Sequence, residues 1–435
     1  MEMMMEQKGE WRPPLEELFL PDVEDEVQEY FSNRAKMLAE KKDIPSLEEA
    51  RALFLLLRGC EGREALLKKC AEEIRKLHKK NALFQPKALK EALKKYSEGI
   101  YNEYIDYYGI SIFAIPEGVQ TVASYAFKKC KSIASLIIPQ GVTHIEGSAF
   151  LECTGLVRIT ISSSVTDLEM SAFSNCCSLK TMYISEENQV YKSADGNILS
   201  RDGKTFYQYA EGKTQTEYVI PDGVTHIEIF ALMDSTHLTD ITIPRSVKSI
   251  GMDAFSRCHQ LRSITIPNSV ILMEKSVFSC CEQLVSVTLP SQITLIPEGT
   301  FFMCSFSQID IPESVTSIGK RGFSECRNLM GISLPRGLMD IGEWAFHKCS
   351  SLTEISLPDR MTCISDYLFK MCEDLRSITI PKGVTKIGAG AFSHCKSLQY
   401  IRYRGNRTQW ERIEKGYHWD EETGNYTVVF DYKGE

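Results

Sequence analysis

Fifteen cysteines give this 435-residue chain its widest choice of chemistry, because a thiol can form a disulfide, bind a metal or act as a nucleophile. Ten of them stand three residues after a phenylalanine, namely Cys130, Cys153, Cys176, Cys258, Cys281, Cys304, Cys326, Cys349, Cys372 and Cys395. Regular repetition would place these ten in a column whose neighbouring side chains point in parallel, which is poor disulfide geometry. We therefore expect a ladder of buried thiols that behave as small hydrophobic side chains.

Metal binding and catalysis find little support in the spacing of these residues. The adjacent pairs Cys176-Cys177 and Cys280-Cys281 lack the two-residue gap of a zinc site. The sequence also contains no Gly-x-Ser-x-Gly, His-Glu-x-x-His or phosphate-binding glycine loop. We expect no catalytic residue, no metal and no cofactor. The alternative of an enzyme requires a site within residues 1–105.

A 23-residue repeat positions the ten cysteines. Its clearest copy contains Ile380-Pro381, Val384, Ile387, Ala391-Phe392, Cys395, Leu398 and Ile401. Prolines mark the registers, namely Pro116, Pro139, Pro221, Pro244, Pro267, Pro290, Pro312, Pro335, Pro358 and Pro381. The step from Pro290 to Pro312 is one residue short. The interval before Pro221 contains a coil with Ser162 at the proline place, followed by an insertion.

The repeat predicts short strands stacked into a solenoid. Leu261, Ile264 and Ile266 alternate with polar residues, as in a strand, and the proline after them ends the ladder. No single coil can close a core, so the coils are expected to fold collectively. At about residues 185–218 the period breaks. Tyr191–Leu199 and Thr205–Tyr209 are predicted strands of a β-hairpin turning at Asp202-Gly203. A weak coil follows, with Met233 interpreted as standing in the cysteine place.

The frame Ile-Pro-x-x-Val-x-x-Ile-x-x-x-Ala-Phe-x-x-Cys-x-x-Leu-x-x-Ile resembles the BspA-like leucine-rich repeat over about residues 110–405. The resemblance implies a curved solenoid used for binding, often in adhesion at a cell surface. The tail with Tyr403, Trp410 and Ile413 looks like the family's terminal cap. The predicted fold class is an α/β leucine-rich-repeat solenoid of about eleven coils with short parallel strands, preceded by an all-α segment.

The predicted domains are a helical segment at 1–105, the solenoid with its insertion at 106–405, and a C-terminal cap at 406–435. Helices are expected at Pro21–Lys42, from the capping residue Ser46 to Arg58, at Glu61–Lys80 and at Pro86–Tyr96. The helical segment is a candidate cap over the first coil, because solenoids need one.

Charge and hydrophobicity restrict the class of partner and the cellular location that we predict. A formal net charge of −8 argues against a nucleic-acid-binding surface. No apolar run is long enough for a transmembrane segment. The first residues lack the basic and apolar regions of a secretory signal, which predicts a cytoplasmic protein. The family-based alternative is a cell-surface or secreted protein. We expect a monomer.

The sequence points to a protein partner. Residues flanking the inward isoleucines should face solvent on the concave sheet, where serine and threonine predominate. The larger and charged residues of this row form the candidate partner-binding face: Arg158, Tyr183, Asp240, Asp310, Glu354, Tyr400 and Arg402. The alternative is that such residues simply suit an exposed sheet. The function expected is a non-enzymatic protein–protein interaction module, with an exported cell-surface adhesin as the alternative.

Overall fold

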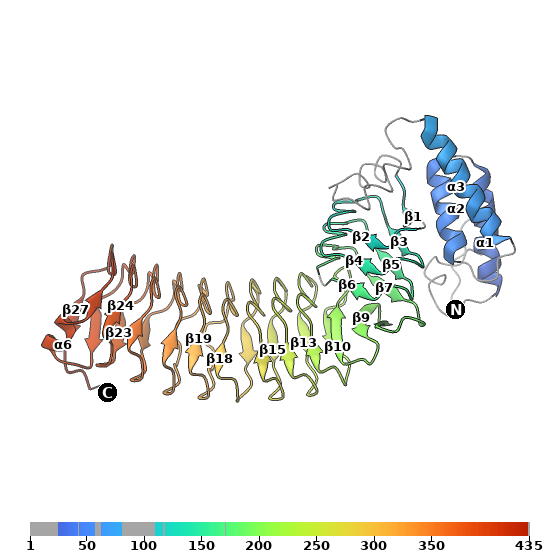
Figure 1. The fold of residues 1–435 in the computed structure, drawn as a ribbon. Helices are drawn as coiled ribbons and strands as arrows, with labels where there is room; N and C mark the ends of the chain where they lie inside the picture. The colour runs from blue at the N-terminus through green and yellow to red at the C-terminus, as the bar shows by residue number, and fades with distance from the viewer. Residues whose placement is uncertain are drawn as a thin grey trace. The chain divides into compact units, whose positions relative to one another are not determined.

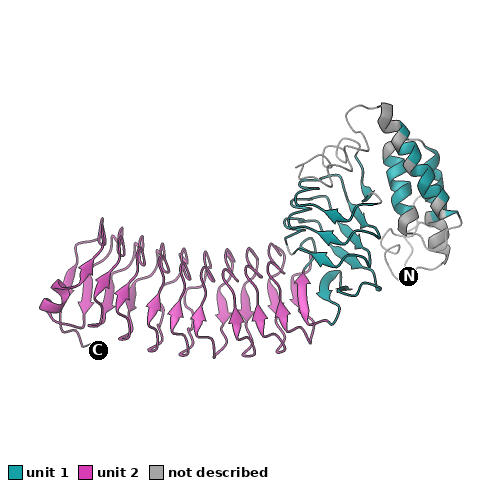
Figure 2. Cartoon of the chain, in the orientation of Figure 1, with its two compact units in different colours: residues 1–202, 209–213 teal, residues 203–208, 214–435 magenta. Residues whose placement is uncertain are grey.

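The computed structural model describes residues 25–41, 43–56, 62–80, 109–115, 118–169 and 171–433. The chain forms two compact units, unit 1 with residues 1–202 and 209–213, and unit 2 with residues 203–208 and 214–435 (Figure 2). Pro116, the first 24 residues and the predicted helix at Pro86–Tyr96 lie outside the described residues. None of the described helices has the length and apolarity needed to cross a bilayer.

Three helices open unit 1, namely α1 (Asp25–Glu40), α2 (Ile44–Leu56) and α3 (Arg63–Lys80) (Figure 1). They match three of the predicted helices to within a few residues. α2 begins before Ser46 because the Asp43 carboxylate accepts a 2.8 Å hydrogen bond from the Ser46 amide, which caps the first turn.

Helix α2 packs on the first coil of unit 1. Ala52 forms a buried apolar cluster with Ile112, Ala114 and Ile137. The Arg51 guanidinium lies 2.8 Å from the Glu48 carboxylate and also donates to the Ala114 carbonyl oxygen. Apolar and polar contacts thus both hold the helix on this coil. The domain boundaries at residues 105 and 405 stay predictions.

Most coils contribute one strand to a first parallel sheet and one shorter strand to a second. In unit 1 the first strands are β1 (Ile112–Ala114), β3 (Ser135–Ile138), β5 (Arg158–Ile161) and β7 (Thr181–Ile184). The second strands of unit 1 are β2 (Thr121–Val122), β4 (His144–Ile145) and β6 (Asp167–Leu168). The pairing register equals the repeat, since Ser135 pairs with Arg158 and Ile145 with Leu168.

Unit 2 continues the same arrangement. Its first strands are β11 (Glu217–Val219), β13 (Asp240–Thr242), β15 (Ser263–Thr265), β17 (Ser286–Thr288), β21 (Glu354–Ser356), β23 (Ser377–Ile380), β25 (Tyr400–Tyr403) and β27 (Thr427–Val429). Its second strands are β10 (Thr205–Gln208), β12 (His226–Ile227), β14 (Ser249–Ile250), β16 (Leu272–Met273), β18 (Leu295–Ile296), β19 (Ser317–Ile318), β20 (Asp340–Ile341), β22 (Cys363–Ile364), β24 (Lys386–Ile387) and β26 (Glu414–Lys415). A short helix, α6 (Arg407–Glu411), precedes β26 and is capped by Asn406.

The parallel solenoid confirms the predicted fold class, although the described residues form about fourteen coils instead of eleven. The lower number came from counting prolines. The coils whose first strands end at Ile184, Tyr403 and Val429 are followed by Ser185, Arg404 and Phe430, so they escape that count.

The structure adds a turn inside the first of the two predicted hairpin strands. Strands β8 (Tyr191–Ala194) and β9 (Asn197–Ser200) are antiparallel and turn at Asp195-Gly196. Both turn residues have positive φ, 49° and 68°, as a tight type I′ hairpin requires. Residues 205–208 form β10, as predicted for the second strand, and the predicted turn residues Asp202-Gly203 lie between β9 and β10, with Gly203 at φ 74°. β10 also runs parallel to β12 in unit 2.

The remaining part of each coil is an arc that runs through the Ala-Phe pair to the cysteine. Its phenylalanines stack along unit 2 from Phe255 to Phe392, with neighbouring ring centroids 5.4 to 5.9 Å apart. The Trp419 ring meets Phe392 edge-on at 6.0 Å and ends the stack. In the weak coil that contains Met233, the backbone N–H of Ser235 donates to the carbonyl oxygen of Leu232. The N–H of Cys258 donates to the carbonyl oxygen of Phe255 in the same way in the next coil. Ser235 therefore holds the cysteine place, and the assignment of Met233 was wrong.

Candidate functional site

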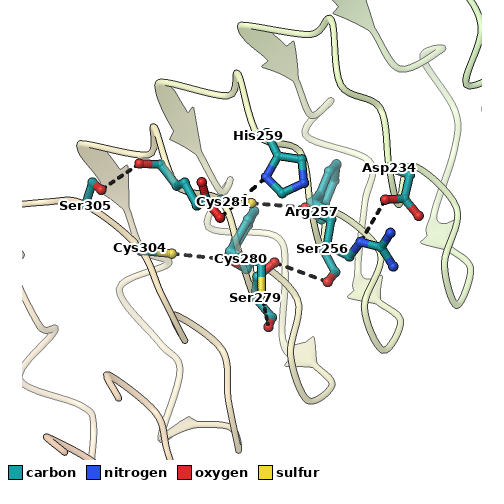
Figure 3. Close-up of polar contacts among 12 residues, drawn as sticks. Asp234, Ser256, Arg257, His259, Ser279, Cys280, Cys281, Cys304 and Ser305 are labelled. Atoms are coloured by element: carbon teal, nitrogen blue, oxygen red, sulfur yellow. Dashed lines mark hydrogen bonds and ion pairs between the residues drawn. The ribbon is translucent and has the colours of Figure 1, made fainter. Parts of the chain in front are cut away.

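The repeat cysteines form the expected column of buried thiols. Each described ladder cysteine from Cys153 on donates its thiol to a carbonyl oxygen of the preceding coil, at 2.9 to 3.2 Å, in the pairs Cys153–Phe127, Cys176–Phe150, Cys258–Leu232, Cys281–Phe255, Cys304–Phe278, Cys326–Phe301, Cys349–Phe323, Cys372–Phe346 and Cys395–Phe369. Figure 3 shows two of these bonds, from Cys281 and Cys304. The column thus joins adjacent coils through hydrogen bonds, with each thiol as the donor.

Burial makes these thiols poor nucleophiles. It holds the pKa values of Cys281, Cys304 and Cys349 well above the ordinary thiol value, and it raises the pKa of Cys395 to about 12. Thiolate is the reactive form, so such groups are inert at neutral pH. Within the described ranges, no three His, Cys, Asp or Glu side chains gather as a metal site.

The edge of the arcs carries ion pairs between successive coils. The Arg257 Nε lies 2.8 Å from the Asp234 carboxylate, and His259 lies 3.9 Å from Glu282 (Figure 3). Asp234 is largely buried, and burial raises the pKa of its carboxyl despite Arg257. These contacts connect one arc to the next, so we assign this edge a structural role.

The candidate binding residues divide between the two units. Arg158 on β5 and Tyr183 on β7 belong to unit 1 and are half-buried. The other five belong to unit 2. Arg402 is half-buried, and four are exposed, namely Asp240, Asp310, Glu354 and Tyr400. We call the solvent side of the first strands the strand face.

Three of these five residues line one groove on the strand face of unit 2. The groove has a volume of about 970 Å³ and brings together Asp310, Glu354 and Arg402. Hydroxyl groups of Ser333, Ser356, Ser377 and Thr379 lie between them. Asp240 and Tyr400 are not among the lining residues. The groove therefore has Asp310 at one end, Arg402 at the other and Glu354 on the coil midway between them, with small polar residues along its floor.

The groove coincides with an interruption of the first sheet. Among the described residues between β17 and β21, the first sheet is represented by the single bridge of Asp310 to Ser333. Gly331 stands where the adjacent coils have Gln308 and Glu354, and a Cβ added to it would meet no atom within 4 Å. In the same coil Ile332 and Leu334 are half-buried, whereas Leu357 in the next coil is buried.

The charged side chains of the groove differ in whether they already have a hydrogen-bond or ion-pair partner. In the part of the chain that the structure describes, the carboxylates of Asp310 and Glu354 have no hydrogen-bond or ion-pair partner. Arg404 pairs with Asp359 at 2.6 Å. The Arg402 guanidinium lies over the Tyr432 ring, 5.3 Å from its centroid, which leaves its N–H groups available. The groove thus has unused acceptors at one end and unused donors at the other.

Comparison with known proteins places this architecture in a family. Three stretches, residues 98–194, 204–329 and 294–413, match the family described as BspA type leucine-rich repeat region, six copies. The chain belongs to this BspA-type family. Comparison with curated proteins finds no match.

Several solved structures are similar to this BspA-type chain. One is a leucine-rich repeat protein from Eubacterium ventriosum ATCC 27560, 18% identical, covering 70% of this chain and 88% of that chain with a TM-score of 0.47. A second, from Bacteroides ovatus ATCC 8483, is 23% identical and covers 73% and 92%, with a TM-score of 0.44. A leucine-rich cell surface protein from Faecalibacterium prausnitzii A2-165 is 28% identical over 69% and 62%, with a TM-score of 0.33.

Reasoning from the BspA-type repeat missed several lining residues. Arg336, Asp359 and Arg404 follow the strands at or beside the proline place, and Tyr432 lies in the C-terminal tail. Gly331 was the available signal, because it is a glycine at a strand position where both adjacent coils have a longer polar residue. Such a position weakens a strand and leaves space beside it.

Proposed function

We propose that this BspA-type chain is a non-enzymatic protein–protein interaction module that binds its partner in the strand-face groove of unit 2. The observation that supports the proposal is the gathering of Asp310, Glu354 and Arg402 in one groove, with both carboxylates unpartnered among the described residues. A partner that supplies complementary charges would form charge-assisted hydrogen bonds, which are the stronger kind.

The surroundings of the groove suit binding by a rigid surface. Three of its floor residues, Ser356, Ser377 and Thr379, belong to strands β21 and β23, which pair in register with each other and with β25. A partner therefore meets a surface that is already ordered, which lowers the entropic cost of association.

Affinity capture with two tryptophan variants tests the proposal. Ser356 lies on the groove floor, and Thr265 is an exposed residue at the equivalent strand position of β15 outside the groove. We expect Ser356→Trp to reduce capture of specific proteins from the source cells and their surroundings at least tenfold. Thr265→Trp should leave capture within twofold. Equal capture by both variants would contradict the assignment of the groove.

The exported-adhesin alternative uses the same groove and differs in where the partner is met. Protease treatment of intact source cells separates it from the cytoplasmic expectation. Removal of the chain by external protease would support the adhesin. Protection of the chain in the soluble fraction would direct the search to intracellular proteins. The enzyme alternative requires turnover that survives replacement of every groove residue and depends on residues 1–105.

A further inference from the structure

The acidic end of the groove has a distinctive construction. Gly331 lies between two coils that present the unpartnered carboxylates, Asp310 on the preceding coil and Glu354 on the following one. Both carboxylates are exposed on the strand face. The open space at Gly331 is therefore bordered by two negative charges on adjacent coils.

The walls of the same space are apolar. Ile332 and Leu334 are half-buried and line the groove, in contrast to buried Ile355 and Leu357 at the equivalent places of the next coil. An apolar wall beneath two carboxylates matches a side chain with an aliphatic stem and a cationic head. Lysine and arginine combine these features, since they bury the stem while the charge stays at the polar surface.

The opposite end of the groove presents a positive charge. Arg402 lies three coils beyond Gly331, because the pairing steps from Glu354 to Ser377 and then to Tyr400 on the same strand as Arg402. At about 4.8 Å per strand this separation is about 14 Å, which an extended peptide spans in about four residues. On the same coil as Arg402, Arg404 is paired with Asp359. Arg336 also lines the groove, but it belongs to the coil of Gly331, where its backbone amide donates to the Glu313 carboxylate at 3.3 Å.

We propose that the groove binds an extended polypeptide segment through one lysine or arginine seated over Gly331 and one carboxylate at Arg402, about four residues apart. This inference rests on the proposed function and adds the chemistry of the partner. Asp310 and Glu354 accept hydrogen bonds from the cationic head, and Arg402 donates to the carboxylate. The order of the two charges along the groove fixes the direction of the bound segment.

An array of synthetic peptides tests the inference with the full chain. The probes are acetylated and amidated decapeptides of serine, threonine and alanine, each with one lysine and one glutamate at spacings from two to eight residues in both orders. Binding is expected to be strongest near a spacing of four residues. Replacing the lysine by norleucine should weaken binding at least tenfold, because the aliphatic stem remains and the charge is lost.

Protein variants then assign each end. Gly331→Thr introduces a side chain into open space, so the chain should fold and lose the preference for lysine. Asp310→Asn with Glu354→Gln should lose the same preference without filling the space, and Arg402→Gln should lose the preference for glutamate. Ser263→Thr, at the equivalent strand position of β15 outside the groove, is the matched control and should bind as the unaltered chain does.

The outcomes separate the inference from the proposed function. If no peptide binds, or if the lysine preference survives Gly331→Thr and the double carboxylate variant, the inference is wrong. Capture of whole proteins that remains sensitive to Ser356→Trp would then leave the proposed function standing. Capture insensitive to Ser356→Trp would remove the proposed function as well.

Discussion

The thiol of Cys281 donates a 3.1 Å hydrogen bond to the carbonyl oxygen of Phe255, which lies in the preceding coil. The same carbonyl oxygen accepts the amide of Cys258 at 3.4 Å. A buried carbonyl thereby has one donor from its own coil and one from the next, which accounts for a thiol at this place in a stack of arcs. The repeated cysteine is a structural feature that combines small volume with a hydrogen-bond donor.

Truncating a ladder thiol should destabilise the solenoid. Cys281→Ala removes both the hydrogen bond and buried volume, which together are expected to cost about 1–2 kcal/mol of unfolding free energy. Cys280→Ala, at the half-buried adjacent residue, should cost less than about 0.5 kcal/mol. Urea unfolding followed by circular dichroism measures both. Equal midpoints for the two variants would show that the ladder thiol contributes nothing.

Thiol reactivity should follow burial. Cys177 and Cys363 are exposed, although partial desolvation raises the pKa of the Cys363 thiol, whereas the ladder cysteines are buried and the pKa of Cys372 is well above the ordinary value. At pH 8 an alkylating reagent is expected to label Cys177 and Cys363 in the folded protein and the ladder residues only after unfolding. Mass spectrometry of the digested protein assigns each site. Rapid labelling of Cys304 in the folded chain would contradict the buried column.

The fold could be predicted because the period is carried by residues with a direct structural consequence. Proline after a strand, an inward isoleucine pair and the Ala-Phe-x-x-Cys arc each repeat at 23 residues, and a stack of coils satisfies all of them. The number of coils was underestimated because Arg404 and Phe430 stand where a proline was required. The turn at Asp195-Gly196 was not predicted, although its residues carry the same local signal as Asp202-Gly203.

The groove was only partly predictable. Asp310, Glu354 and Arg402 were named because alternation along each strand shows which residues face solvent. Their gathering depends on the interruption at Gly331 and on the stacking of Tyr432 beneath Arg402, both of which are tertiary effects. The sequence also gave no reason to separate these three residues from Asp240 or Tyr400, which share the strand face but lie outside the groove.

A glycine in the arcs provides a test of backbone conformation. Gly390 has φ of 57°, in the left-handed region, and a Cβ there would approach the Tyr367 ring to 2.6 Å. Gly390→Ala is expected to cost about 1–2 kcal/mol of unfolding free energy. Gly337→Ala, where the nearest atom is 3.7 Å away and φ is ordinary, should change it by less than about 0.5 kcal/mol. Thermal unfolding of both variants decides the matter, and a larger loss for Gly337→Ala would contradict the structure.

His347 should make stability depend on pH. Burial, with a smaller contribution from Lys348, lowers the pKa of this imidazole to about 4, and Ser324 lies 3.3 Å from its Nδ1. Between the unfolded pKa of about 6.5 and pH 4, the unfolded chain binds a proton that the folded chain does not, so stability falls as pH falls through this window. Because His347 is partly exposed, the expected loss is about 1–2 kcal/mol.

The variant His347→Gln isolates this contribution. The difference in unfolding free energy between the unaltered chain and the variant should decrease from pH 7 to pH 4 and then stay constant. Denaturant unfolding at half-unit pH steps gives the difference directly. A difference that is independent of pH, or that grows as the pH falls, would rule out a neutral His347 in the folded state.

Site-specific photo-cross-linking shows directly whether a partner binds in the groove. A photoreactive phenylalanine analogue replaces Ser333 in the groove, Thr265 on the strand face outside it, or Glu282 on the exposed edge of the arcs. If the partner binds in the groove, illumination of the variants in the source cells should give discrete protein adducts from position 333 and none from positions 265 and 282. Adducts from position 282 with none from position 333 would place the binding surface on the arcs and contradict binding in the groove.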